Sequence, residues 1–221
     1  MGHVIAIDGP AGAGKSTLAR RVASKLEYLY IDTGAMYRTI ALWALRQGIE
    51  PDDSHRLGQL ATAAQIELTT DGQVRLNGED VTAEIREPHV SLLASRVAAI
   101  ASVRSALVDK QRQYAEMANV VMEGRDIGTV VFPSARVKIY LDADTSERAR
   151  RRSAEQPHVP TAQLAEDIAQ RDNRDRSREV SPLMQAPDAV YIDSTGLTID
   201  EVEEKILQLV RSRVSNGKVG G

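Results

Sequence analysis

The chain has 221 residues, a net charge of −3 and no cysteine. This length suits one sizeable α/β core with at most a small insert, and the charge does not indicate a general binder of nucleic acid or anionic membranes. Disulfides, thiolate metal sites and cysteine nucleophiles are excluded. No apolar run approaches the ~20 residues that span a bilayer. The opening residues MGHVIAIDG lack the features of a secretory signal, so a cytoplasmic protein is expected.

The first part of the chain is expected to alternate strands with helices. Residues 3–7, HVIAI, form a short apolar run rich in β-branched residues, as a buried parallel strand does. After a glycine-rich segment, apolar residues recur every four positions from Leu18 to Leu26, which predicts a helix. Residues 28–32 predict a second strand, and residues 34–48 predict a helix that ends at its last glycine.

Residues 66–82 depart from this pattern because polar and apolar side chains alternate there as in β-strands. Asp71-Gly72 stands between two strand-like runs, which is a hairpin signal. Since strands elsewhere alternate with helices, we expect the hairpin to belong to a small insert at residues 52–90.

The rest of the chain returns to alternating elements. The expected elements are a long helix at 91–117, strands at 119–124 and 137–143, a basic helix within 146–160, a helix at 161–179, a strand at 189–193 and a closing helix. Thr198 or Asp200 is expected to cap the closing helix, and the tail at 215–221 to be disordered. Strands alternating with helices favour a parallel sheet.

The glycine-rich segment carries the most specific motif. Residues 9–16, GPAGAGKS, match the pattern G-x4-G-K-[ST] at every position, between a predicted strand and a predicted helix. Its glycines allow backbone N–H groups to surround phosphates, and the helix N-terminus adds its positive end. Lys15 would reach the β- and γ-phosphates, and the Ser16 hydroxyl would coordinate Mg²⁺. The motif predicts nucleoside triphosphate binding but names no reaction.

A second phosphate site is expected on the late helix at 161–179. Its apolar face includes Ile168, and steps of three and four residues continue that face to Arg171, Asp175 and Arg178. Charges that face inward are costly unless they meet a partner. We expect that partner to be bound phosphate, with Asp175 orienting the guanidinium groups. A solvated, salt-bridged helix end is the alternative.

Other charged groups in this region allow a structural as well as a functional interpretation. Asp172 and Arg176 are spaced for an i, i+4 ion pair on a neighbouring helix face. The segment SERARRR at 146–152 contains four arginines and precedes a proline-bearing stretch, which predicts a mobile lid that reaches the transferred phosphoryl group. A basic surface helix is the alternative. The spacing does not choose among the four arginines, and we assign Arg151 to ATP binding.

Two groups of arginines together with the glycine-rich phosphate-binding motif suit phosphoryl transfer between two bound phosphates. Positioning and charge neutralisation by Mg²⁺, Lys15 and the arginines would carry the catalysis. No catalytic base is needed when the acceptor is already a phosphate oxyanion. Another small-molecule kinase and a nucleotide-dependent switch are the alternatives, although the sequence lacks the Asn-Lys-x-Asp motif of guanine-binding proteins.

Six segments together resemble the bacterial cytidylate kinases, which are nucleoside monophosphate kinases. The segments are AIDGPAGAGKSTLAR, DTGAMYR, GEDVTAEIR, EGRDIGTVVFP, KIYLDAD and RDNRDRSREVSPL, and the resemblance runs from residue 4 to about residue 210. It implies a three-layer α/β P-loop kinase fold with a central five-stranded parallel sheet. The core would comprise residues 1–51, 91–147 and 161–221, with a monophosphate-binding insert at 52–90 and a lid at 148–160.

The motif and the resemblance also imply roles for individual residues. The ATP site would comprise Gly9, Pro10, Ala11, Gly12, Ala13, Gly14, Lys15, Ser16, Thr17 and Arg151. The CMP site would comprise Thr33, Tyr37, Arg38, Ser95, Arg104, Arg125, Asp126, Arg171, Asp175 and Arg178. Within it, Arg38 would bind the CMP phosphate, Tyr37 would flank the base, Ser95 and Arg104 would read its edge, and Asp175 would bind the sugar hydroxyls. Lys15, Arg125, Arg171 and Arg178 would be catalytic.

The resemblance implies that Asp126 accepts a hydrogen bond from the exocyclic amine of cytosine. Uracil presents a carbonyl oxygen at that position, so a fixed carboxylate would favour cytosine; a turn or cap aspartate is the alternative. Glu123 is a candidate partner for Mg²⁺ alongside Ser16, although Asp is more usual there, and Asp8 competes for this role.

The expected reaction is Mg²⁺-dependent transfer of the γ-phosphoryl group of ATP to CMP or dCMP, a step of pyrimidine metabolism. The enzyme is expected to be a cytoplasmic monomer that binds neither nucleic acid nor membranes.

Overall fold

The computed structural model describes residues 2–69 and 72–215. The chain forms two compact units, Met1–Tyr30 with Ala118–Gly221 and Ile31–Met117. The insert predicted at 52–90 lies inside the second unit and the lid predicted at 148–160 inside the first. The boundaries of the core, the insert and the lid stay predictions.

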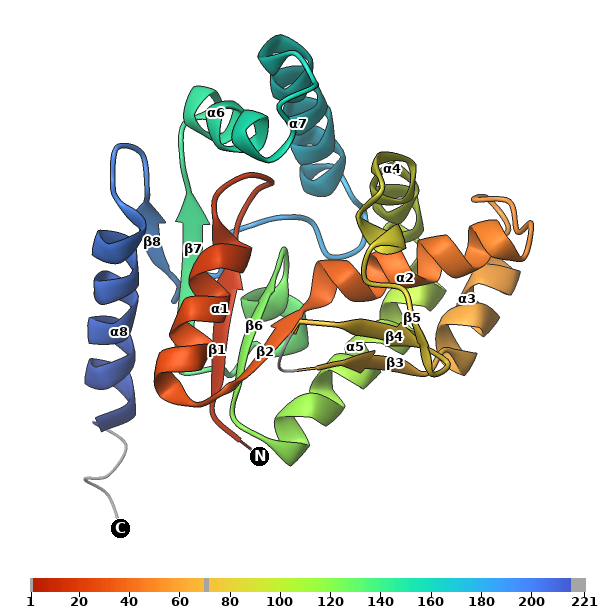
Figure 1. Cartoon of the computed structure of the whole chain (residues 1–221). Helices are drawn as coiled ribbons and strands as arrows, with labels where there is room; N and C mark the ends of the chain where they lie inside the picture. The colour runs from red at the N-terminus through yellow and green to blue at the C-terminus, as the bar shows by residue number, and fades with distance from the viewer. Residues whose placement is uncertain (1, 70–71, 216–221) are drawn as a thin grey trace. The chain divides into compact units, whose positions relative to one another are not determined.

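The first unit is built on a parallel sheet (Figure 1). Its strand order is β2-β6-β1-β7-β8, with bounds Leu29–Asp32, Val120–Gly124, Val4–Asp8, Val137–Asp142 and Val190–Asp193. β1 pairs in parallel with β6 and β7, and β7 pairs in parallel with β8. Almost every residue of β1, β6 and β7 is buried, which is why these strands consist largely of apolar residues. The predicted α/β class and five-stranded parallel sheet are confirmed.

Two helices of the first unit, α1 (Lys15–Leu26) and α8 (Ile199–Ser215), pack together beside the sheet (Figure 1). Leu18 and Val22 are buried in the same apolar cluster as Ile206. The apolar face predicted for this helix from the sequence therefore does face the core. At the start of α8, Thr198 Oγ1 accepts from the backbone N–H of Glu201, and Glu201 Oε2 accepts from that of Thr198. This reciprocal pair identifies Thr198 as the cap.

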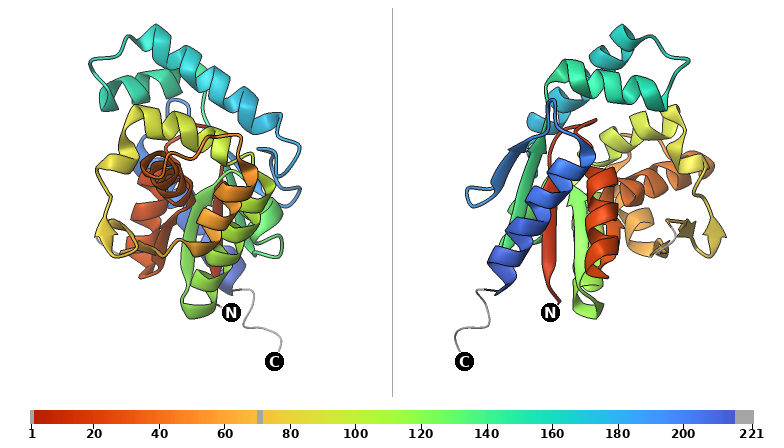
Figure 2. Two further views of the ribbon diagram at one scale, coloured as in Figure 1. Left: turned by 90° about the vertical axis from the view of Figure 1, so that its right-hand side faces the viewer. Right: turned by 60° about the vertical axis from the view of Figure 1, so that its left-hand side comes forward.

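The helices α6 (Thr145–Glu155) and α7 (Thr161–Arg176) lie beyond the carboxyl ends of β1 and β7 (Figure 2). Between β6 and β7 comes the short turn η2 (Ile127–Val131). α7 ends three residues earlier than predicted, because the chain leaves the helix at Ser177 and folds back so that the Leu183 N–H reaches the Asp175 carbonyl. Residues 216–221 of the tail predicted to be disordered lie outside the described residues.

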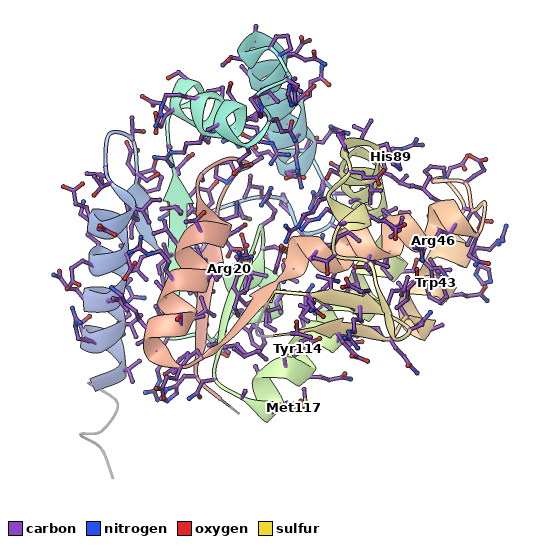
Figure 3. All side chains as sticks on the ribbon, viewed as in Figure 1. Arg20, Trp43, Arg46, His89, Tyr114 and Met117 are labelled. Atoms are coloured by element: carbon purple, nitrogen blue, oxygen red, sulfur yellow. The ribbon has the colours of Figure 1, made fainter. Side chains whose placement is uncertain are left out.

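The second unit combines helices with a small antiparallel sheet. Its helices are α2 (Thr33–Arg46), α3 (Ser54–Ala63), η1 (Glu84–Arg86), α4 (Pro88–Val97) and α5 (Ala101–Met117). They share one apolar core that includes Met36, Leu57 and Leu107. Arg46, labelled in Figure 3, ends α2 and forms ion pairs with Glu79 and Glu84, which ties α2 to the small sheet and to η1.

The small sheet contains the predicted hairpin and a second hairpin that was not predicted. β3 (Ile66–Leu68), β4 (Val74–Leu76) and β5 (Glu79–Asp80) are antiparallel neighbours. Asp71 of the predicted turn lies outside the described residues. The second turn is Asn77-Gly78, where both residues have positive φ angles of 51° and 86°. Asn-Gly is the preferred pair for such a two-residue turn, so the sequence did carry this signal.

The single long helix predicted at 91–117 is wrong, because α4 and α5 are separate helices bent by 100°. The N–H groups of Ala99 and Ile100 bond three residues back, which tightens and ends α4. The buried Arg104 guanidinium donates to the carbonyl of Ala98, a group freed at the bend. In the described part of the chain, no helix by itself has the length and hydropathy of a membrane span; α4 and α5 reach that threshold only as a bent pair.

Candidate functional site

The carboxyl ends of β1 and β6 bring the first candidate residues to one edge of the sheet, where α/β proteins commonly bind ligands. β1 ends at Asp8 opposite Gly124 of β6. The Asp8 carboxylate accepts from the N–H groups of Ile127 and Gly128 at 2.8 and 2.7 Å, which anchors the segment after β6. Burial raises the pKa of Asp8 to about 6 despite these two N–H donors.

The phosphate loop, Gly9–Gly14, connects β1 to α1 in a conformation that requires glycine. Gly9 has a φ angle of 149°, and a Cβ there would lie 2.0 Å from the carbonyl oxygen of Leu141 on β7. Gly14 has a φ angle of 91° and immediately precedes α1. The loop therefore lies close to β7 and leads directly into a helix N-terminus, which is the geometry that the motif predicts for a phosphate site.

Lys15 is almost completely buried at the start of α1. Its Nζ donates to the carbonyl oxygen of Pro10 at 2.7 Å. The pKa of Lys15 is lowered to about 7, first by burial and then by the positive charges of Arg125 and Arg171, against the opposing effect of Glu123. Lys15 is thus part of a positively charged cluster, which an anionic ligand would stabilise.

Two arginines, one just after β6 and one just after α7, hold one buried carboxylate of α7. Asp175 is 1% exposed; Arg125 Nε donates to one of its oxygens at 2.8 Å, and Arg178 Nη2 donates to the other. Burial by itself would raise the pKa of Asp175, but Arg125, Arg178 and Arg171 outweigh it and hold this pKa below its usual range. The guanidinium groups of Arg125 and Arg178 therefore point toward buried Asp175, and the binding of phosphate by this group stays a prediction.

The predicted pair of Asp172 with Arg176 is wrong. Asp172 faces the core beside Leu164 and Ile168, and its partner is Arg148 of α6, whose Nη1 lies 2.5 Å from Asp172 Oδ2. Arg176 is exposed and hydrogen-bonds Tyr140 instead. The helical spacing allowed both partners, and the packing of α6 against α7 selected Arg148.

The four arginines of α6 have different surroundings. Arg150 and Arg152 form ion pairs with Glu147 and Glu155 at the surface, as the alternative of a basic surface helix predicts. Arg148 is buried and bonded within the first unit. Their lid function stays a prediction.

Arg151 has the contacts expected of a residue beside a nucleotide site. Its guanidinium donates to the carbonyl of Ala13 in the phosphate loop at 3.3 Å, and to the hydroxyl and carbonyl of Ser194 at 3.0 and 2.8 Å. A Cβ on Gly14 would lie 3.6 Å from Arg151 Nη1. The Arg151 guanidinium therefore contacts both the phosphate loop and Ser194, the first residue after β8.

The two candidate carboxylates for Mg²⁺ both lie at the end of a strand. Glu123 is buried, and its Oε1 accepts from the Tyr30 hydroxyl at 2.6 Å; Arg20, labelled in Figure 3, stacks over the Tyr30 ring. Within the described residues, no three His, Cys, Asp or Glu side chains form a metal-binding group. Mg²⁺ commonly takes only one or two protein oxygens and completes its shell with phosphates and water, so Ser16 with Glu123 or Asp8 fits its chemistry.

The second unit holds most of the remaining candidates, whereas Asp126 is buried just before η2 in the first unit. Arg38 donates to Asp32 at 3.0 Å, and Asp32 also accepts from the Ala35 N–H as the cap of α2. Arg104 stacks over the ring of Tyr37, with its guanidinium carbon 5.6 Å from the ring centroid. Thr33 is buried as the first residue of α2. The structure thus brings Arg38 to Asp32 and Arg104 to Tyr37.

Several buried polar atoms of this unit have no hydrogen-bond partner among the described residues. They include the Ser95 hydroxyl, in a residue that is 6% exposed, and Nε of Arg38. Buried polar groups are nearly always paired, so a polar ligand is a reasonable partner for both.

Asp32 and Asp172 were assigned no part in the site from the sequence, and Arg148 was one of four lid arginines among which the sequence did not choose. The sequence did contain a signal for Asp32, because an aspartate directly before a helix is a typical N-terminal cap. Its partner Arg38 follows six residues later. No local signal identifies the pair of Arg148 with Asp172, because these residues are 24 positions apart on different helices.

The chain matches known families and folds over most of its length. The sequence model of the cytidylate kinase family matches residues 5–212. A cytidylate kinase of Solibacter usitatus is 60% identical, with 97% of this chain and 95% of that protein covered; one of Desulforamulus reducens is 54% identical, with 93% and 96% covered. A bifunctional pantoate ligase/cytidylate kinase of Trichormus variabilis is 48% identical over 96% of this chain but 42% of its own length.

Solved structures share the fold at low sequence identity. An uncharacterized protein from Eubacterium ventriosum has a TM-score of 0.58 at 13% identity, with 96% of this chain and 100% of that one covered. A gluconokinase from Sinorhizobium meliloti has a TM-score of 0.50 at 15% identity, with 97% and 94% covered. At such identities the likeness concerns the fold alone.

Proposed function

The chain belongs to the cytidylate kinase family and catalyses phosphoryl transfer from ATP to CMP or dCMP, and we propose which of its residues carry this reaction. The donor site is the phosphate loop with the start of α1, Gly9–Thr17, together with Arg151. Support comes from the left-handed glycines, the helix N-terminus and the contact of Arg151 with Ala13. The backbone N–H groups bind the phosphates, and Lys15 as an ammonium ion neutralises the β- and γ-oxygens.

We further propose that Mg²⁺ binds with ATP through Ser16, with Glu123 or Asp8 as the acidic partner. When bound, the metal ion supplies charge neutralisation at the β- and γ-phosphates. The chain's own contribution is to hold oxygen ligands at the strand ends: Tyr30 orients Glu123, and the N–H groups of Ile127 and Gly128 orient Asp8.

Both units contribute to CMP binding in this proposal. The second unit supplies Arg38 for the phosphate and Thr33, Tyr37, Ser95 and Arg104 for the nucleoside. The unpartnered Ser95 hydroxyl and Arg38 Nε support this assignment. Fixed donors placed in a dry site cost no reorganisation during the reaction, which makes them effective in phosphoryl transfer.

The first unit supplies Arg125, Arg171 and Arg178 for the transferred phosphoryl group, Asp175 for the sugar hydroxyls and Asp126 for the cytosine amine. The observation that carries the proposal is the cluster around buried Asp175: two guanidinium groups hold its carboxylate, and Arg125 and Arg171 act electrostatically on Lys15. Glu123 and Asp8 offset part of the positive charge around Lys15, and a bound phosphate group would offset more of it.

Closure of the insert at 52–90 and the lid at 148–160 over the nucleotides would exclude water and limit ATP hydrolysis. We also propose that the enzyme acts as a monomer in the cytoplasm. Size-exclusion chromatography with light scattering would test the oligomeric state, and a mass near twice 24.1 kDa would contradict it.

The test of the proposed function is a coupled assay of ADP release with CMP, dCMP, UMP and AMP as acceptors. We expect kcat/KM for CMP or dCMP to exceed that for UMP by at least about tenfold, since a base edge that leaves buried polar groups unpaired is strongly disfavoured. Preference for UMP would contradict the cytosine assignment. Absence of ADP with every monophosphate would contradict the kinase activity itself.

A further inference from the structure

The buried ion pair between Arg148 of α6 and Asp172 of α7 does more than join two helices. Both residues are almost inaccessible, at 5% and 3% exposure. Besides Asp172, the Arg148 guanidinium donates to the carbonyl of Ala143 at 3.0 Å and to the Thr145 hydroxyl at 3.2 Å. Such a network fixes the guanidinium plane, because each of its nitrogens has a partner in a different direction.

The pair holds Ala11 of the phosphate loop from both sides. The Ala11 N–H donates to Asp172 Oδ1 at 3.1 Å, and the Ala11 carbonyl accepts from Arg148 Nη1 at 3.0 Å. Gly12 adjoins the same arginine, since a Cβ there would lie 3.1 Å from Arg148 Cβ. One ion pair therefore determines the orientation of two consecutive peptide groups.

Peptide planarity transmits this orientation to the phosphate-binding groups. In a trans peptide the N–H and the preceding C=O point in opposite directions. With the Ala11 N–H held by Asp172, the carbonyl of Pro10 points the other way, where it accepts from Lys15 Nζ at 2.7 Å. With the Ala11 carbonyl held by Arg148, the N–H of Gly12 is likewise directed away from α6.

The charge of this pair also matters for a loop that binds an anion. A carboxylate next to the loop would repel phosphate, and Asp172 is acceptable there because Arg148 neutralises it at hydrogen-bond distance. An apolar pair could join α6 to α7 equally well, since buried ion pairs are seldom the most stable solution. The contacts to Ala11 supply a reason for the ion pair that packing alone does not.

We propose that Arg148 and Asp172 are positioning residues for the ATP phosphates, acting through the Pro10–Ala11 and Ala11–Gly12 peptide groups and through Lys15. The inference rests on the proposed binding of ATP at the phosphate loop. It predicts that breaking the pair weakens ATP binding much more than CMP binding, because none of the hydrogen bonds made by Arg148 and Asp172 involves a residue assigned to CMP.

The experiment compares Asp172→Asn and Arg148→Lys with the wild-type enzyme. Asn keeps the shape and can still accept from Ala11, but it cannot neutralise Arg148; Lys keeps the charge but loses the planar fork. For each variant we expect KM for ATP to rise about tenfold, the factor that corresponds to about 1.4 kcal/mol, with KM for CMP within about twofold of wild type.

The matched control is Glu203→Gln. Glu203 is a buried carboxylate that pairs with Arg21 and Lys25 between α1 and α8, away from the phosphate loop. This variant should lower the melting temperature without changing the ratio of the two KM values. A purely structural role for the pair of Arg148 and Asp172 would produce the same result as the control, and that outcome would overturn the proposal.

Direct titration with ADP separates failure of this inference from failure of the proposed ATP site. Loss of ADP binding in Lys15→Ala, together with normal binding in Asp172→Asn and Arg148→Lys, would overturn the positioning role alone. Normal ADP binding in Lys15→Ala would overturn the assignment of ATP to the loop. If Asp172→Asn does not fold, the ratio of KM for ATP to KM for CMP in Arg148→Lys tests the proposal instead. If neither variant folds, the pair is required for folding and the proposal is wrong.

Discussion

Replacing Arg178 by alanine separates catalysis from folding more clearly than any other single change in the proposed site. Arg178 lies just after α7, with its side chain 8% exposed, and contacts one oxygen of Asp175. The other oxygen is held by Arg125 Nε at 2.8 Å. Removing Arg178 therefore leaves Asp175 paired with one arginine rather than isolated.

The loss of stability in Arg178→Ala should be limited, because the ion pair of Asp175 with Arg125 remains. One charge-assisted hydrogen bond is lost, which corresponds to about 1.5–3 kcal/mol of stability. For a chain of this size the melting temperature should fall by roughly 5–10 °C. The protein should therefore remain folded at 25 °C, where the assay is made.

The catalytic cost should be larger. A guanidinium group aimed at the transferred phosphoryl group stabilises charge that develops in the transition state, and removing one such donor typically lowers kcat by about 10²–10³-fold. We expect that loss in the coupled assay with saturating ATP and CMP, alongside a circular dichroism melting curve that confirms the fold.

Arg174→Ala is the matched control for this experiment. Arg174 lies in the last turn of α7, four residues before Arg178, and among the described residues its Nε donates to the carbonyl of Gln170, on its own helix, at 3.3 Å. Its variant should keep kcat within about twofold of wild type. A folded Arg178→Ala enzyme with kcat within about threefold of wild type would refute the phosphoryl-binding role and leave Arg178 as a structural partner of Asp175.

Three further predictions concern the base, the phosphate loop and the second unit. Asp126→Asn should reduce the CMP-to-UMP ratio of kcat/KM at least about tenfold, since an amide can also donate to the uracil oxygen; an unchanged ratio would exclude Asp126 from base selection. The pKa of Lys15 is about 7 in the folded protein, against an ordinary value of 10.5. Between pH 7 and pH 10.5 the unfolded chain therefore binds more protons than the folded chain, so the free energy of unfolding should rise with pH in this range. Urea unfolding of the Lys15→Met variant should show no such rise. The Asp32→Asn variant keeps a good helix cap but loses the negative charge that orients Arg38. We therefore expect KM for CMP to rise about threefold to tenfold at a nearly constant melting temperature. Equal losses of CMP binding and ATP binding would argue against a local effect on Arg38.

Several features of the site could be predicted because their cause is local. The G-x4-G-K-[ST] pattern determines a phosphate loop by itself, since Gly9 and Gly14 adopt backbone angles that other residues rarely accept. Apolar runs without alternation identified the buried parallel strands. The inward direction of Asp175 followed from a spacing of seven residues from Ile168, two turns along the same helix.

Other features depended on partners that lie far away in the sequence. The bend between α4 and α5 has neither glycine nor proline, and it is held by Arg104, which donates to Ala98 from the next helix. Helical periodicity continues through such a break, so the pattern predicted one helix. Unlike that bend, the second hairpin has a local sequence signal, Asn77-Gly78, but the prediction assigned the segment to the first hairpin and did not use this pair.

The amino-acid sequence alone determined that the chain has a parallel α/β core, a phosphate loop and an inward-facing arginine group, and its motifs indicated the cytidylate kinase family. Backbone conformation and side-chain periodicity decide these features over a few residues. Only the tertiary structure decided which charges become partners: Asp172 had Arg176 within one helical turn, yet it pairs with Arg148 on another helix and with the backbone of Ala11. The physical reason is that a buried charge takes the partner that shares its burial, and burial is a property of the packed chain.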